Sequence, residues 1–161
     1  MQSDMHNLFP TVGEVNGDRS NFLFGEIDGE EREYGQCDFE VAERIAEPKK
    51  SIRGDIARSY FYMSHQYKME IPDDYEEMLR EWHLFDPPDE WERDRNSLIE
   101  DAQGNRNQFT PSLVMVFSIK NSDKAGRWDS SFWSCNVPCM AFISGSDVLP
   151  SRNCSILSRT D

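Results

Sequence analysis

The stretch HNLFPTVGEVNGDRSNFLF, residues 6–24, sets polar side chains between apolar anchors. Pro10 suits the first turn of a helix, so we expect a helix to begin there. Asn7 and Asn16 lie nine residues apart, or two and a half helical turns, so both amides can face the same side. The polar side chains of the stretch that can bind metal or phosphate are His6, Asn7, Glu14, Asn16, Asp18, Arg19 and Asn21.

This density of carboxylate and amide oxygens predicts a site for a hard cation. Mg²⁺ binds such oxygens, keeps most of its waters and needs few protein ligands beside a substrate phosphate. The other interpretation is a surface helix followed by a turn at residues 16–18, because Asn, Gly and Asp are ordinary turn residues.

Five blocks of sequence, taken in order and spacing, resemble the bacterial endonuclease I family. The blocks are HNL at 6–8 with GEVNGDRSNF at 13–22, YGQC at 34–37, RGDIAR at 53–58, YFYM at 60–63 and QGNRN at 103–107. The resemblance covers about residues 3–109. It implies a periplasmic or secreted nuclease that cuts DNA and RNA without sequence preference, built as a His-Me finger in which a hairpin carries the general-base histidine.

The resemblance also implies roles for residues of the first stretch. The metal-binding asparagine of the finger falls on Asn16, with Glu14 and Asn21 as alternates, and the ion is Mg²⁺ or another divalent cation such as Ca²⁺. His6 and Asn7 become supporting residues, and Arg19 a candidate for phosphate contact.

The hairpin that carries the family's general base does not match any part of the chain. In the family, a segment of the type Arg-Glu-His stands well before the HNL block, whereas five residues precede His6 here. His6 is too close to Asn16 to serve as the missing general base. We therefore expect an N-terminally truncated His-Me finger fold without its catalytic hairpin, with little nuclease activity of its own.

Charge divides the chain near Thr110. Residues 1–109 hold 26 acidic and 12 basic side chains, whereas residues 110–161 hold 4 and 5. Strong acidity argues against a broad basic face for nucleic acid, although a bound cation and local arginines can replace one. Arg53, Arg58 and Arg106 are the candidates for nucleic-acid contact. They could instead pair with the chain's own carboxylates, and the domain could be a catalytically inactive acidic module that mimics DNA or binds a basic protein.

The same boundary predicts two regions: an endonuclease I-like domain over 1–109, and an atypical tail over 110–161 that is disordered or unrelated. Cys37 stands alone in the first region, so in an exported protein we expect a disulfide to the tail or to a partner outside the sequence. No signal peptide is visible and no apolar run could span a membrane. We expect a monomer whose full-length form is periplasmic or secreted.

Hydrophobic spacing predicts a mainly α (α+β) domain. Helices are expected over about 51–67, 73–85 and 88–102, the first packed on several sides and the third burying Trp91, Leu98 and Ile99. Residues 25–50 read as a loop, with one short strand or helix near 39–45. The β component is expected to come from the missing hairpin or from the tail, where residues 113–119 suggest a strand. His65 and His83 are assigned to helix ends, where the helix dipole favours them.

Overall fold

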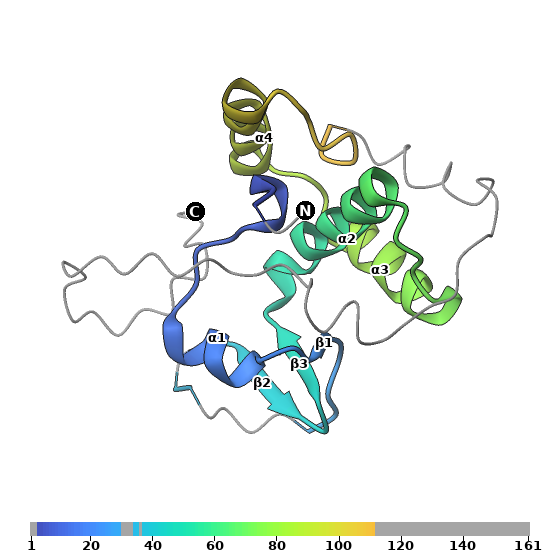
Figure 1. The fold of residues 1–161 in the computed structure, drawn as a ribbon. Helices are drawn as coiled ribbons and strands as arrows, with labels where there is room; N and C mark the ends of the chain where they lie inside the picture. The colour runs from blue at the N-terminus through green and yellow to red at the C-terminus, as the bar shows by residue number, and fades with distance from the viewer. Residues whose placement is uncertain (1–2, 30–33, 36, 112–161) are drawn as a thin grey trace.

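A computed structural model describes residues 3–29, 34–35 and 37–111 of the chain. It is a mainly helical α+β fold, as the sequence predicted, in which a small sheet and α1 lie at one end and α4 at the other (Figure 1). The helical elements are η1 (Met5–Asn7), α1 (Gly13–Arg19), η2 (Lys50–Ile52), α2 (Arg53–Tyr67), α3 (Asp73–Phe85) and α4 (Glu90–Gln103).

The sheet has three strands, β1 (Leu23–Phe24), β2 (Phe39–Ala42) and β3 (Ile45–Pro48), in the order β1-β3-β2. β1 runs parallel and β2 antiparallel to β3. Glu43 and Arg44, with φ of 50° and 68°, join β2 to β3. Positive φ at both central residues is the pattern of a type I′ hairpin turn.

The short element predicted near 39–45 is confirmed as strand β2, but β3 lies where a loop was predicted, and the predicted origin of the β component was wrong. The sheet is formed within residues 23–48. The sequence concealed this hairpin because its turn carries Glu and Arg, where Asn and Gly are usual. The strand predicted over 113–119, and the tail as a whole, lie outside the described residues.

α2 is the central helix, as expected. Every residue from Arg53 to Met63 is buried, and α3 packs against this helix. The aromatic residues of α2 meet Leu79 and Trp82 of α3 in one core cluster, which Phe109 joins from beyond α4. Burial on all sides explains why apolar and aromatic residues, which recur at helical intervals, cover a wide arc of α2.

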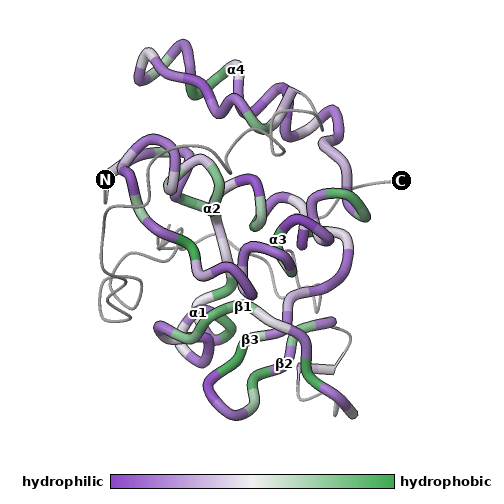
Figure 2. Tube along the Cα trace, turned by 90° about the vertical axis from the view of Figure 1, so that its right-hand side faces the viewer, coloured by the Kyte–Doolittle hydropathy of each residue, from purple (hydrophilic) through white to green (hydrophobic). Residues whose placement is uncertain are grey.

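α4 differs from its predicted packing. Ile99 is buried, but Leu98 is 68% exposed and Trp91 38% exposed. Its inward face is polar instead, since Glu92, Asn96 and Ile99 follow each other at helical spacing and are all buried. Figure 2 shows α4 as a mostly hydrophilic helix. A search for apolar periodicity cannot find a buried face of this kind.

Two further features concern single residues. His83 lies in the last turn of α3, as predicted, and is buried beside Phe61 and Arg58. Cys37 is buried and takes part in a disulfide; the chain's other cysteines, Cys135, Cys139 and Cys154, lie outside the described residues. Within the described part of the chain, no helix is long and apolar enough to cross a membrane.

Candidate metal and nucleic-acid site

Helix α1 carries the residue predicted to bind the cation. It begins at Gly13, three residues later than Pro10 suggested, and ends at Arg19. Val15 and Arg19 face inward, whereas Glu14 and Asp18 are exposed. The helix is short because its N-cap, Val12, has no side-chain oxygen to cap it and Ser20 has left helical geometry at φ 49°.

Asn16 presents an amide that no described side chain or backbone group occupies. It is half-buried, and no described residue hydrogen-bonds its side chain; the same holds for Asn21. Asp18, by contrast, accepts a 2.8 Å hydrogen bond from the Tyr34 hydroxyl. Asn16 and its alternates Glu14 and Asn21 thus remain available as oxygen donors.

The donor set suits a cation that needs few protein ligands. Among the described residues, no group of three or more His, Cys, Asp or Glu side chains could hold a metal ion. A single amide oxygen fits a cation such as Mg²⁺, which completes its shell with water and phosphate. It does not fit a structural zinc site, which needs four protein ligands.

Arg19 is placed for packing rather than for phosphate contact. Its residue is 4% exposed, and its guanidinium lies 5.1 Å from the centroid of the Phe24 ring. Nη1 also donates to the Phe22 carbonyl at 3.5 Å. A phosphate could reach this group only if the side chain left its pocket.

His6, for which a supporting role was predicted, is buried against α2. It is 1% exposed, its ring centroid lies 4.5 Å from that of Tyr62, and Nε2 lies 3.2 Å from the Asn105 carbonyl oxygen. Burial lowers the pKa of His6. A ring enclosed in this way has no access to a water molecule at a reacting phosphate.

Two buried oxygens follow His6 and have no hydrogen-bond partner among the described residues. They are Asn7 Oδ1 and Thr11 Oγ1. Leaving a buried polar group unsatisfied costs about 1–3 kcal/mol. The rest of the fold therefore holds the segment that leads into α1 in place, although these two oxygens cost free energy locally.

Asp4 is the centre of a polar cluster that the sequence did not reveal. Its carboxylate accepts hydrogen bonds from the Tyr62 and Tyr67 hydroxyls, both at 2.7 Å, from Gln103 Nε2 at 2.8 Å and from the His6 backbone N–H at 2.9 Å. Burial works against the charge, but these donors lower the pKa of Asp4 below its ordinary value. Burial and the Asp4 charge raise the pKa of Tyr67 to about 12.

Arg58 lies in a buried network. Its guanidinium donates to both carboxylate oxygens of Glu92 at 2.7 and 2.5 Å, to Asp55 at 3.1 Å and to the Asp86 carbonyl at 2.7 Å. The residue is fully buried. The structure gives Arg58 a structural role, and this is the alternative that the sequence had left open.

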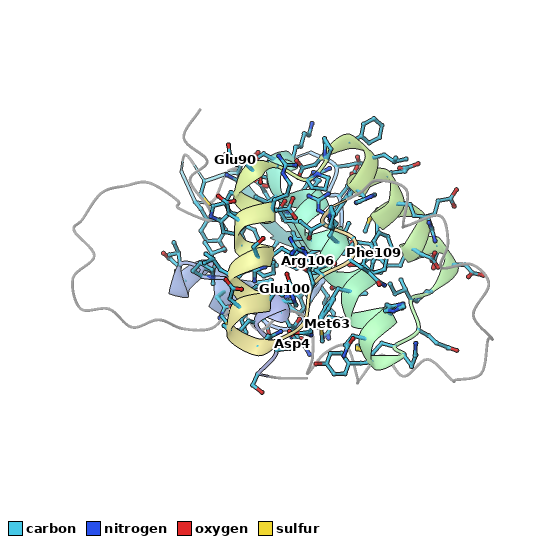
Figure 3. All side chains as sticks on the ribbon, turned by 90° about the horizontal axis from the view of Figure 1, so that it is seen from above. Asp4, Met63, Glu90, Glu100, Arg106 and Phe109 are labelled. Carbon is cyan, nitrogen blue, oxygen red and sulfur yellow. The ribbon has the colours of Figure 1, made fainter. Side chains whose placement is uncertain are left out.

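Arg53 is held in the same manner at the sheet end of α2. It pairs with Glu26 at 2.6 Å and with Glu47, and Nε donates to the Pro48 carbonyl at 3.2 Å. Arg106 differs because it is on the surface, where it pairs with Glu100 and donates to Ser97 Oγ at 3.1 Å (Figure 3). Of the three predicted contact arginines, only Arg106 is placed where nucleic acid could meet it.

The fold and site together define a mainly helical α+β domain in which a short helix carries a half-buried asparagine amide. The Endonuclease I family model matches residues 1–112 of the chain. The chain belongs to this family.

All the curated relatives considered are nucleases by name, and several are named as extracellular or periplasmic. An extracellular deoxyribonuclease of Aeromonas hydrophila is 44% identical over 112 residues, which cover 68% of this chain and 49% of that protein. A periplasmic deoxyribonuclease of the same organism is 43% identical over 68% of this chain and 47% of its own. An extracellular ribonuclease of Bacillus subtilis is 32% identical over 66% of this chain and 43% of its own length. The chain spans about half the length of the curated relatives it matches.

Several of the residues that carry the resemblance prove to hold the fold together. Gln103 and Asn105 bind the Asp4 cluster, since Gln103 contacts Asp4 and Asn105 donates to the Tyr62 hydroxyl at 2.5 Å. Asn107 bonds to Asn96 and to the Arg58 carbonyl. The signal that could have found Asp4 is its position one residue before η1, where it caps the first turn.

Proposed function

We propose that this domain is the helical part of a metal-dependent endonuclease that hydrolyses phosphodiester bonds of DNA and RNA without sequence preference. Family membership supports the reaction class, and the relatives named as deoxyribonucleases and a ribonuclease support both substrates. The observation that carries the metal dependence is the unoccupied amide of Asn16 on α1, on a domain whose buried arginines cannot supply the positive charge.

In this proposal, Asn16 binds Mg²⁺ or a similar cation such as Ca²⁺ through its amide oxygen, with Glu14 or Asn21 as alternates. When bound, the cation stabilises charge that develops on the phosphate and aligns the reacting groups. Arg106, at the surface, contributes to contact with the sugar-phosphate backbone of the nucleic acid. Asn7 and His6 keep the segment before α1 in its buried position.

The general base is proposed to lie outside the described residues. The chain contains three histidines, of which His6 and His83 are buried. His65 packs its ring against Phe109, with the centroids 6.2 Å apart. Loss of a general base costs about 10²–10⁴-fold in rate. We therefore expect the 161-residue chain to nick DNA only weakly.

A plasmid-nicking assay tests both parts of the proposal. Slow nicking that needs Mg²⁺ and stops with EDTA is the expected result, and Asn16→Ala should abolish it while Gln66→Ala, an exposed amide on α2, leaves it unchanged. Rapid cleavage by wild type would show that the base is within the chain. Nicking that persists in EDTA would exclude the metal-dependent mechanism.

We further propose that the protein acts outside the cytoplasm, as a monomer. The names of the relatives and the disulfide at Cys37 support export, because disulfides persist in oxidising compartments. Light scattering on the purified chain should give one protomer. A dimer mass at micromolar concentration would overturn the monomer assignment.

A further inference from the structure

The segment before α1 is bound by α4 in a way that neither the metal site nor the core explains. We call residues 4–9 the N-terminal strap. Arg95 of α4 donates from Nη2 to two strap carbonyls, that of Met5 at 2.6 Å and that of Leu8 at 2.9 Å. Its guanidinium also lies 4.2 Å from the centroid of the Phe9 ring and 5.9 Å from that of Trp91.

The other end of α4 holds the beginning of the strap. Gln103 accepts a 2.9 Å hydrogen bond from the Met5 backbone N–H and donates to Asp4 at 2.8 Å. η1, within the strap, packs against both α2 and α4. Figure 3 shows Asp4 at the Glu100 end of α4. Gln103 thus holds the start of the strap, and Arg95 binds the strap both at Met5 and near its end at Leu8.

The strap connects directly to the proposed metal helix. Only residues 10–12 separate Phe9 from Gly13, the first residue of α1. The two unsatisfied buried oxygens, Asn7 Oδ1 and Thr11 Oγ1, lie within the strap and within this connection. A segment that only packed would turn such oxygens to a donor or to solvent, whereas this one is held so that they stay unmatched.

We propose that Arg95 is a positioning residue: by clamping the strap to α4 it fixes the place of α1 and therefore of the Asn16 amide. This inference rests on the proposed function for its consequence in metal binding. Its geometric part, the dependence of α1 on Arg95, stands apart from that function. Arg95 does not touch the cation; it acts through the strap.

The guanidinium is suited to this task. One nitrogen reaches two carbonyls while the planar group stacks on an aromatic ring, which an ammonium cannot reproduce. Arg95→Met retains much of the apolar length but removes both the donors and the charge. Arg95→Lys keeps the charge and a donor but loses the stacking. It should therefore restore only part of the strap binding that Arg95→Met loses.

Amide hydrogen exchange on this chain tests the geometric part. Arg95→Met should speed exchange of the strap and also of the α1 amides of Asn16 and Ser20, which bond to Val12 and Asn16 carbonyls, while α2 keeps its protection. The matched control is Arg93→Met, which removes an exposed α4 arginine that donates to the Pro88 carbonyl. Unchanged exchange in α1 with a loosened strap would overturn the proposal.

Titration with Mn²⁺ alone, followed by water-proton relaxation, tests the consequence for the cation. Arg95→Met should weaken Mn²⁺ binding by about 10- to 100-fold, the scale for lost outer-shell partners. Ile99→Val, a buried change on α4, controls for general destabilisation and should leave Mn²⁺ binding unchanged. Equal Mn²⁺ affinity in wild type and Arg95→Met would overturn the link from Arg95 to the site. If wild type binds no Mn²⁺, the proposed function fails, and the exchange experiment still decides whether Arg95 positions α1.

Discussion

Single residues in this domain are constrained mostly by buried charge. Gly54 illustrates this, because a Cβ there would lie 1.9 Å from the Asp86 carbonyl oxygen and 2.8 Å from the Arg58 guanidinium nitrogens. The RGDIAR block therefore records a close approach of α2 to the segment after α3. Its glycine makes room for the Arg58 network, and its Asp55 pairs with Arg58.

We expect Gly54→Ala to lower the free energy of unfolding by about 1–3 kcal/mol, because the contact is with backbone that cannot move aside cheaply. Gly17→Ala in α1 is the control: a Cβ there meets nothing within 4 Å, and its φ is ordinary. Gly17→Ala should raise the free energy of unfolding by about 0.4–1 kcal/mol. Urea unfolding measures both, and equal effects would contradict the packing assigned to Gly54.

Asp4 predicts a pH dependence of stability. Its pKa is lowered from the ordinary 3.8 by donors present only in the folded state, so it contributes stability above that value and loses it as the pH falls through the folded pKa. Asp4→Asn should therefore be less stable than wild type at pH 7, and the difference should narrow below about pH 4. Thermal unfolding from pH 7 to pH 3 measures it; a difference that stays constant would count against the Asp4 cluster.

Among the elements, the hairpin and α4 show what the sequence concealed. α2 and α3 were predictable because their apolar residues recur at helical intervals and Pro87 with Pro88 ends α3. The β2–β3 hairpin was missed because its turn lacks Asn or Gly. The packing of α4 was missed because Glu92 and Asn96 read as solvent-facing residues, although Glu92 meets Arg58 and Asn96 meets Asn107.

The hairpin turn predicts that a single substitution can raise the free energy of unfolding. Glu43 has φ of 50°, a conformation that Asn adopts more readily than Glu. Glu43→Asn should raise the free energy of unfolding by up to about 1 kcal/mol, whereas Arg44 is left in place because its guanidinium lies 5.3 Å from the Phe22 ring centroid. Denaturant unfolding checks this. A loss of stability would argue against the type I′ turn.

At the scale of the whole molecule, the positions of the arginines show how a strongly acidic chain is consistent with the proposed nuclease function. The domain carries 26 acidic side chains over residues 1–109, and it uses Arg53 and Arg58 to neutralise its own interior. The resemblance assigned the proposed metal-binding asparagine to Asn16, and no described residue hydrogen-bonds that side chain. The strap and its clamp could not be predicted, because their contacts join residues about ninety positions apart.

The most direct test of the account is Mn²⁺ binding to wild type and to Asn16→Ala, with Gln66→Ala as the matched amide control. We predict that wild type and Gln66→Ala bind Mn²⁺ alike, and that Asn16→Ala binds it about 10-fold or more weakly. Equal binding by all three proteins would remove Asn16 from the cation site and contradict the account.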